Sequence, residues 1–265
     1  MDNKQRKQFL ELYLNGNQKS AIDFAKNHRP QYIYKYCSFD KKGKNLENIQ
    51  NDCVYLCSPS KFNDPYDCKI HLNKNEIKPN LKLGISYEEF INDIQKSNKI
   101  SCFSEFKDNL IMWAHYAKKH QGFCIQYNIS DINPILNIPE EDSSMSVGLF
   151  PVIYQENLLD FTEEFIDIMK TPKPYTGALS AFISVLVKYN QWEYEQEWRL
   201  IAINIKSDDG QYSPPIKPSA IYLGTKIKPE NKIAIKEIAK EKSIPVFKME
   251  FSNKAEYKLY QKRIQ

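Results

Sequence analysis

The sequence predicts an α+β fold in which helices pack around a mixed, mostly antiparallel sheet core. About eight short β-prone runs recur along the chain, and the helical segments between them differ in length, unlike a regular βαβ series. The 265 residues are 42% hydrophobic and 13% aromatic, which is enough for a substantial buried core. Eight glycines leave no room for a glycine-rich phosphate loop.

Residues 1–30 are expected to form a helical extension. Apolar side chains from Phe9 to Leu14 share one helical stripe, and a second short helix follows an Asn-Gly-Asn turn. Residues 31–265 are expected to form a single α+β domain, because no linker is long enough to separate two. Its first half is expected to contain strands at 32–36 and 53–57 and helices at 45–50 and 86–96.

The central segment, residues 100–127, is expected to fold as strand, turn, helix, turn and strand. Asp108 can cap the helix, because its carboxylate can accept the free N–H groups of the first turn. Trp113, Tyr116 and His120 lie at positions i, i+3 and i+7 and so share one helical face. Such a helix is either a core helix with polar tips or one wall of a pocket.

Gly122 is expected to end this helix through a positive φ. The segment 128–150 is polar and irregular and is expected to be a loop. The remaining expected helices are 158–169, 175–189 and 230–242. The remaining expected strands are 151–154, 192–203, 220–223 and 246–249, the last followed by a basic tail.

Composition narrows the class of protein. A formal charge of +4 from 37 basic and 33 acidic residues is too small and too even to indicate nucleic acid or a membrane by itself. The six cysteines lack metal-ligand spacing, so they are interpreted as small buried hydrophobic residues and no metal is expected. Without a signal region or a run of about 18 apolar residues, a reduced cytoplasmic protein is expected.

The loop at 62–67 gathers Asn63, Asp64 and Asp67 around a turn that Pro65 restrains. Two interpretations stay open. The loop is either a rigid hydrogen-bonded turn or a ligand-contacting segment at the end of a strand. Two carboxylates and one amide do not complete the oxygen shell of a divalent metal.

The sharpest chemical pattern is Glu195, Glu197 and Arg199, which alternate along an expected strand and therefore share its face. Carboxylates about 7 Å apart oppose each other's ionisation, and Arg199 is expected to keep Glu197 charged. A carboxylate held in this way suits an acceptor or a general base. The alternative is a surface ladder of mutually neutralising charges. His115 and His120 lie roughly 140° apart on the helix and cannot jointly hold a metal.

Four segments occur in a distinctive order. They are 34–36 (YKY), 62–67 (FNDPYD), 102–123 with the motifs CFSE, MWAHY and HQGF, and 192–199 (WEYEQEWR). This combination, spanning about residues 32–224, resembles the bacterial family catalogued as domain of unknown function 2971. The resemblance brings no established activity with it.

A first strand with Tyr-x-Tyr, a second strand ending in Ser and a late Glu are similar, more distantly, to the ADP-ribosyltransferase order. That likeness implies an ADP-ribosyltransferase-like fold and NAD as substrate, held near nicotinamide by the first two strands while the late Glu stabilises an oxocarbenium-like centre. It maps Lys35 or Tyr36, Ser58 and Glu197 onto these roles. The Glu-x-Glu form of 195–197 also occurs in some of those enzymes.

The leading hypothesis is therefore an NAD-consuming transferase or glycohydrolase, of the kind used as an intracellular toxin or phage-defence effector. Its expected catalytic residues are Glu197, Arg199 and Glu195. Its expected ligand-binding residues are Tyr34, Lys35, Tyr36, Ser58, Asn63, Asp64, Asp67, Ser104, Trp113, His115, Tyr116 and His120.

Two alternatives stay open. One is a nucleic-acid-binding or nucleic-acid-processing protein that tracks phosphates with the basic tail and with Lys118, Lys119, Lys226 and Lys228. The other is a non-catalytic module in which the 63–67 loop and the helix hold a ligand. A small-molecule nucleotide is the expected partner and no membrane is expected, while a protein or nucleic-acid acceptor and the oligomeric state stay open.

Overall fold

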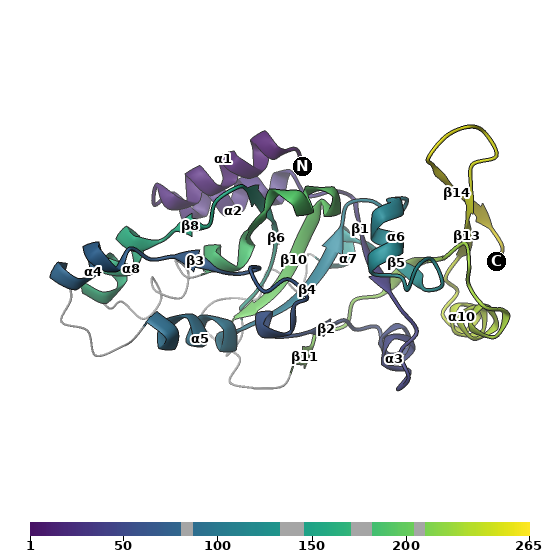
Figure 1. Ribbon diagram of the computed structural model, residues 1–265. Helices are drawn as coiled ribbons and strands as arrows, with labels where there is room; N and C mark the ends of the chain where they lie inside the picture. Colours follow the sequence, from purple (N-terminus) through teal and green to yellow (C-terminus); the bar gives the residue numbers. More distant parts are fainter. Residues whose placement is uncertain (81–86, 133–145, 171–181, 204–209) are drawn as a thin grey trace.

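An eight-stranded sheet forms the centre of the structure (Figure 1). The computed structural model describes residues 1–80, 87–132, 146–170, 182–203 and 210–265. The strands lie in the order β14 (Leu259–Arg263), β13 (Val246–Phe251), β12 (Pro218–Leu223), β5 (Phe123–Asn128), β1 (Tyr32–Cys37), β4 (Asn98–Ser104), β10 (Glu197–Ile203) and β6 (Ser146–Pro151). Neighbours are antiparallel, apart from the parallel pair β12 and β13. The described residues confirm the predicted α+β fold.

Smaller strand pairs lie outside this sheet. β2 (Tyr55–Leu56) pairs with β11 (Gln211–Tyr212), β3 (Ile70–His71) with β8 (Leu159–Asp160), and β7 (Ile153–Gln155) with β9 (Val187–Tyr189). The pairing of β7 with β9 is parallel and sets Lys188 beside Tyr154. This short ladder matters for the site described below.

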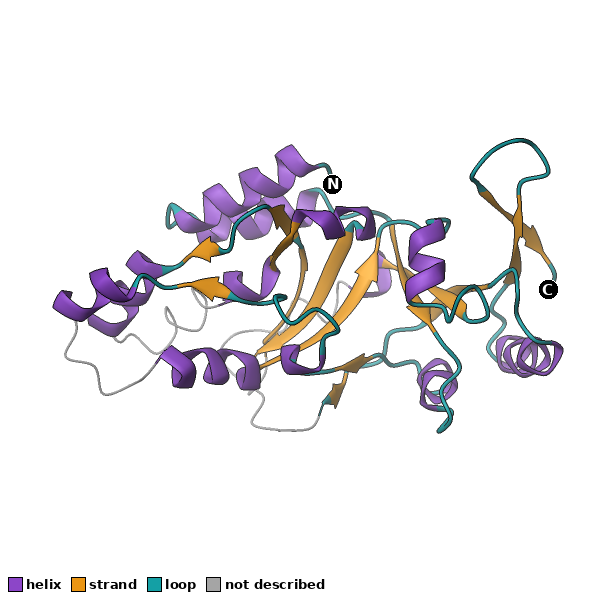
Figure 2. Ribbon diagram, in the orientation of Figure 1, coloured by secondary structure: helices purple, strands orange, loops and turns teal. Residues whose placement is uncertain are grey.

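Helices surround the sheet (Figure 2). They are α1 (Asn3–Leu14), α2 (Gln18–Asn27), α3 (Lys44–Gln50), α4 (Lys74–Asn80), α5 (Tyr87–Ser97), α6 (Leu110–His115), α7 (Ile129–Ile132), α8 (Thr162–Lys170) and α10 (Pro229–Glu241). Short 3₁₀ helices occur at Pro59–Lys61, Ile183–Leu186 and Asn190–Glu195. No helix in the described part of the chain has the length and apolar character needed to cross a bilayer.

The two faces of the sheet carry different cores. On one face, Phe103, Trp198 and Leu200 pack in an apolar cluster with side chains of α3 and α10. On the other face, one apolar cluster joins α1, α2 and α5 to the sheet, and a second forms around Trp113 of α6. Alternation along the strands produces this division, because successive side chains point to opposite faces.

A polar strip separates the two clusters of the second face. Glu197 pairs with Ser104 across β10 and β4, so both side chains lie on that face. Ile201, farther along β10, belongs to the apolar cluster that contains side chains of α1, α2 and α5. Tyr34 of β1, which pairs with Ser104, belongs to the apolar cluster around Trp113. The polar strip therefore lies between two apolar packing regions.

The central helix is shorter than expected. Asn109, not Asp108, caps α6, and its side chain accepts the N–H groups of Ile111 and Met112. α6 ends at His115, so Trp113, Tyr116 and His120 do not share one continuous helical face. The left-handed backbone lies at residues 118–120 (φ 48°, 56° and 68°), before Gly122. Gly122 is instead needed for close approach, because a Cβ there would lie 2.1 Å from the Cys37 carbonyl oxygen.

Several expected boundaries are wrong in the second half. The expected strand at 192–203 begins at Glu197, because the 3₁₀ helix occupies 190–195 and Gln196 is left-handed with φ 44°. The expected helix at 175–189 is, in its described part, a 3₁₀ turn followed by β9, and 175–181 lies outside the described residues. The expected loop at 128–150 includes α7 and most of β6, and 133–145 lies outside the described residues.

Candidate functional site

Five charged side chains meet in the polar strip and form what we call the charged cluster: Asp67, Lys188, Glu195, Glu197 and Arg199. All five are buried. Three are carboxylates and two are cations, and they come from a loop, from β9, from the end of a 3₁₀ helix and from β10. Their burial shows that the interpretation of Glu195, Glu197 and Arg199 as a surface ladder is wrong.

Lys188 joins all three carboxylates of the cluster. Its Nζ lies 2.5 Å from Glu195 Oε2, 3.0 Å from Glu197 Oε2 and 3.5 Å from Asp67 Oδ2. Sequence reasoning missed this residue, because it lies in the expected helix at 175–189. The available signal was a single lysine within the apolar run ISVLVKY at 183–189, since a buried charge requires a partner.

Arg199 organises the other side of the cluster. Its Nη2 donates to both oxygens of Asp67, at 2.8 and 2.7 Å, and its Nε donates to Glu197 Oε1 at 2.8 Å. Nη1 donates to the carbonyl oxygen of Val185 at 2.6 Å. The guanidinium is therefore paired with two carboxylates, an arrangement in which loss of one partner is costly.

The environments of the two glutamates push their pKa values apart. Burial raises the pKa of Glu195, the charge of Glu197 raises it further, and Lys188 and Tyr116 oppose this, leaving a pKa of about 7. Burial also opposes ionisation of Glu197, but Arg199 and Lys188 outweigh it and hold the pKa of that carboxyl well below its ordinary range. Near neutral pH, Glu197 is charged while Glu195 titrates.

The backbone and side chain of Glu195 are held from two directions. The Ser104 hydroxyl donates to its carbonyl oxygen at 2.7 Å. The Tyr116 hydroxyl donates to its Oε1. Burial and the charge of Glu195 raise the pKa of Tyr116, so this phenol remains a neutral donor. Asn109, the α6 cap, also donates to the Tyr194 carbonyl at 2.7 Å. The α6 region therefore positions the Glu195 turn.

The cluster borders a cavity of about 160 Å³, which we call the carboxylate cavity. It is lined by aromatic side chains as well as by the cluster. Nine of the predicted site residues line it: Tyr34, Lys35, Tyr36, Asn63, Asp67, Ser104, Tyr116, Glu195 and Glu197. Arg199 belongs to the cluster without lining this cavity. The structure thus brings together segments that are far apart in the sequence.

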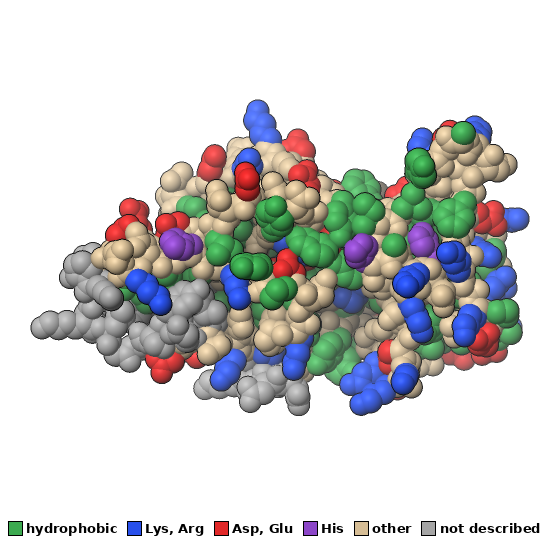
Figure 3. Space-filling view, in the orientation of Figure 1, with side chains coloured by type: hydrophobic (Ala, Val, Ile, Leu, Met, Phe, Trp, Pro, Cys, Tyr) green, Lys and Arg blue, Asp and Glu red, His purple; other side chains and the backbone are tan. Residues whose placement is uncertain are grey.

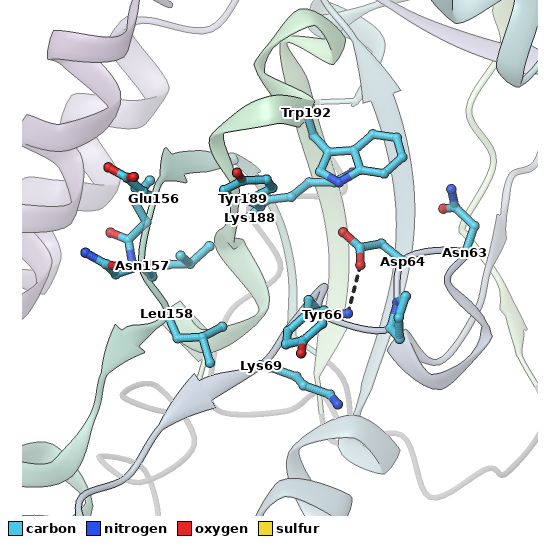
Figure 4. Close-up of a pocket in the computed structure, with 13 residues that line it drawn as sticks. Asn63, Asp64, Tyr66, Lys69, Glu156, Asn157, Leu158, Lys188, Tyr189 and Trp192 are labelled. Carbon is cyan, nitrogen blue, oxygen red and sulfur yellow. Dashed lines mark hydrogen bonds between the residues drawn. The ribbon is translucent and has the colours of Figure 1, made fainter.

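A second, larger cavity of about 520 Å³ adjoins the first (Figure 4). Asn63 and Lys188 line both cavities. Asp64, predicted from sequence, lies here and accepts the Tyr66 N–H at 2.8 Å. Its other prominent side chains are Tyr66, Lys69, Leu158, Tyr189 and Trp192.

Four predicted ligand-binding residues line neither cavity. Ser58, which follows β2, is buried, and its hydroxyl donates to the Gln95 carbonyl at 2.9 Å. Trp113 is a core residue whose indole donates to the Lys107 carbonyl. His120 stacks near Trp113, and His115 is exposed on the end of α6. These four side chains therefore lie apart from the residues that the two cavities bring together.

The lysines of the nucleic-acid hypothesis lie elsewhere. Lys118 and Lys119 are exposed on the turn after α6, and Lys226 is exposed after β12. None of them lines either cavity. In Figure 3, basic side chains gather at the end of the molecule that carries the C-terminal strands, away from its middle. Among the described residues, no group of three or more His, Cys, Asp and Glu side chains has the arrangement of a metal site.

Residues 112–200 match the family model described as Protein of unknown function (DUF2971). The match begins within α6 and includes Lys188 and the segment from Glu195 to Arg199, and it supports the predicted resemblance over these residues. Comparisons with curated proteins and with solved structures find no match. The likeness to ADP-ribosyltransferases gains no support from these comparisons.

Proposed function

We propose that the carboxylate cavity is the active site of an enzyme that breaks the N-glycosidic bond of a pyridinium nucleotide such as NAD. The charge of the cluster carries this proposal. Within the charged cluster three carboxylates face two cations, so the cluster carries one excess negative charge when Glu195 is ionised, while the ammonium of Lys35, which also lines the cavity, is bound by the Ser101 hydroxyl and the Cys102 carbonyl. In a buried site this charge favours a cationic ring, or positive charge that develops on the sugar during bond cleavage.

Glu195 is the group best suited to act on the substrate. Its pKa of about 7 lets it accept a proton at neutral pH, and Tyr116 and Lys188 fix its two oxygens. Glu197, the expected catalytic residue, is held ionised by Arg199 and Lys188, which keep its pKa well below the ordinary range, so it accepts a proton much less readily than Glu195. We therefore assign Glu197 and Arg199 a positioning role: they hold Lys188 and the start of β10 in place.

The proposed reaction is balanced with water alone. The bond between the ribose carbon and the pyridinium nitrogen breaks, and its electron pair goes to the nitrogen, so nicotinamide leaves neutral. Water attacks the oxocarbenium-like carbon and gives its proton to Glu195. A hydroxyl of a protein or nucleic acid in place of water would give transfer. Tyr34 and Tyr36 offer rings beside the departing nicotinamide. Depletion of NAD would suit a toxin or defence effector.

Nicotinamide release from NAD by the purified protein tests the proposal. We expect Glu195→Gln to lower the rate by about 10² or more, because the amide has nearly the same shape but cannot accept the proton. Glu193→Gln is the matched control, since Glu193 lies in the same 3₁₀ helix and lines neither cavity.

The outcomes separate the hypotheses. No nicotinamide release and no thermal shift with NAD would remove the proposal. A thermal shift without release would leave a recognition module, the alternative expected from the 63–67 loop. Equal loss of activity in both glutamine variants would show that Glu195 has no special role.

A further inference from the structure

We infer that the larger cavity is a second subsite that binds the other aromatic end of the same ligand, so that the substrate is a dinucleotide and not a mononucleotide. The inference rests on the proposed function, which supplies the bond that is broken and therefore the end of the ligand that lies in the carboxylate cavity. It concerns different residues, namely Tyr66, Lys69, Tyr189 and Trp192, and it has a binding test of its own.

The two cavities are neighbours that share two residues of their walls. Asn63 and Lys188 line both, and the Lys188 ammonium that contacts the carboxylates also lies 5.0 Å from the centre of the Trp192 ring. A ligand with its scissile bond beside Glu195 would pass these two side chains on its way to the larger cavity. Trp192 is therefore linked to the charged cluster by one side chain.

Their sizes assign different parts of the ligand to each cavity. Small-molecule sites usually measure about 300–1,000 Å³. The carboxylate cavity, at about 160 Å³, is below that range and suits one small ring near the reacting bond. The larger cavity, at about 520 Å³, lies within it and has room for a nucleoside with phosphate.

The lining of the larger cavity suits a planar ring. Tyr66 is 65% exposed and Tyr189 is 47% exposed, so neither ring serves the core. In Figure 4, Trp192 and Tyr66 lie on either side of Asp64, with Lys188 and Tyr189 near Trp192. Hydrophobic side chains also gather at the middle of the face in Figure 3. Stacking of a base on aromatic side chains contributes about 1–3 kcal/mol.

Polar groups at the same cavity match the rest of a nucleotide. The exposed Lys69, whose ammonium lies 5.5 Å from the Tyr66 ring centre, can bind a phosphate next to a stacked base. The carboxylates of Asp64 and Glu156 can accept ribose hydroxyls. An aromatic, hydroxylated and phosphorylated group is the chemistry that this combination recognises.

Trp192 provides a direct readout. The sequence has three tryptophans, and the other two, Trp113 and Trp198, are 0% exposed. We expect AMP, which lacks the scissile bond, to quench the fluorescence of Trp192 in the intact protein. In Trp192→Phe, AMP is expected to cause no quenching of the remaining tryptophan fluorescence. In a calorimetric titration, Trp192→Ala is expected to weaken AMP binding about five- to hundredfold.

Kinetics with two substrates complete the test. For Trp192→Ala and Tyr66→Ala, we expect KM for NAD to rise by a larger factor than KM for nicotinamide mononucleotide, which does not reach the larger cavity. Tyr257→Ala is the control, because Tyr257 is 98% exposed and lines neither cavity. Absence of AMP binding, or equal effects on both substrates, would overturn the subsite and leave the cleavage site intact. AMP binding without nicotinamide release would support the subsite and overturn the proposed reaction.

Discussion

Glu195 changes its charge near neutral pH within a cavity, so its titration should be visible in the rate of reaction. The pKa of Glu195 is about 7, and the proposed reaction uses the ionised form. We expect nicotinamide release to rise as pH increases through 7 and the residual rate of Glu195→Gln to lack this rise. A rate that falls over the same range would show that the protonated form is the active one.

The same titration links pH to folding. The pKa of Glu195 rises from the ordinary 4.5 to about 7 in the folded state, which therefore binds the proton more tightly than the unfolded state. This stabilisation is fully present below about pH 4.5 and is lost as pH rises through about 7. Relative to Glu195→Gln, we expect the free energy of unfolding to fall by about 2 kcal/mol between pH 5 and 8. Urea unfolding across this range checks the sign and size.

Arg199 is the residue on which the stability of the cluster depends most. Arg199→Met would leave Asp67 and Glu197 buried without their main partner, so we expect a loss of about 3–5 kcal/mol. Lys228→Met is the control, because its 4.0 Å contact with Glu230 is exposed and should contribute less than about 0.5 kcal/mol. Equal unfolding midpoints for the two variants would contradict this account.

Alternation along a strand places Glu197 and Arg199 together, and β10 is regular over both residues. The same rule fails for Glu195, because the left-handed Gln196 interrupts the strand. The predicted meeting of Glu195 with Glu197 nevertheless occurs, through Lys188. The partners of that lysine could not be assigned from local sequence, since its contacts depend on the pairing of β7 with β9.

At the scale of elements, α1 supports the start of β10 directly. Asp2 and Gln5 form a capping box that begins the helix. Arg6, which is buried, donates to the carbonyl oxygens of Val152 and Glu197 at 2.7 and 2.9 Å and to Glu105 Oε1 at 2.9 Å. The helical extension expected at residues 1–30 thus contacts the backbone of the site.

Arg6→Met should reveal this support. It would remove the side-chain donor to the Val152 carbonyl and one of the donors to Glu105 and to the Glu197 carbonyl, which keep the Met1 ammonium, the Trp198 indole and the Val152 N–H, and we expect a loss of about 1–3 kcal/mol. The neighbouring Lys7 is exposed, so Lys7→Met should change stability by less than about 0.5 kcal/mol. Chemical denaturation of both variants checks the difference. If they unfold alike, α1 holds the site through its apolar side chains alone.

The central helix shows what a motif can and cannot predict. Its position next to the site was predicted, and Tyr116 does contact Glu195. Its length was not, because the three left-handed residues after Ala117 are stabilised by tertiary contacts such as the hydrogen bond from Lys226 N–H to the His120 carbonyl. Trp113 consequently anchors α6 in the core, and Tyr116 alone of that predicted face lines the cavity.

At the scale of the whole molecule, the N-terminal helices share a core with the sheet. Phe9 and Tyr13 of α1 belong to the same apolar cluster as Ile201 of β10. We therefore expect one cooperative unfolding transition, with midpoints that coincide when followed by tryptophan fluorescence and by far-ultraviolet circular dichroism. A separate early loss of helical signal would show that residues 1–30 unfold independently.

The sequence patterns predict the fold class and most strands of the large sheet, because alternation and β-prone composition are local properties. They do not predict the order of the strands. β1 lies between β4 and β5, and β10 lies beside β4, through pairings set by the packing of both faces. β14 was expected to be only a basic tail, since it buries a single residue, Leu259.

The order of the sheet leaves β14 and β6 as its two borders, where unpaired main-chain groups could recruit a strand from another molecule. Each border carries its own deterrent. On β14, Lys262 and Arg263 carry positive charges. β6 ends in Pro151, and the Arg29 guanidinium donates a hydrogen bond to the Leu149 carbonyl of the same strand. These features would discourage edge-to-edge aggregation and let the chain keep a wide sheet in a crowded environment.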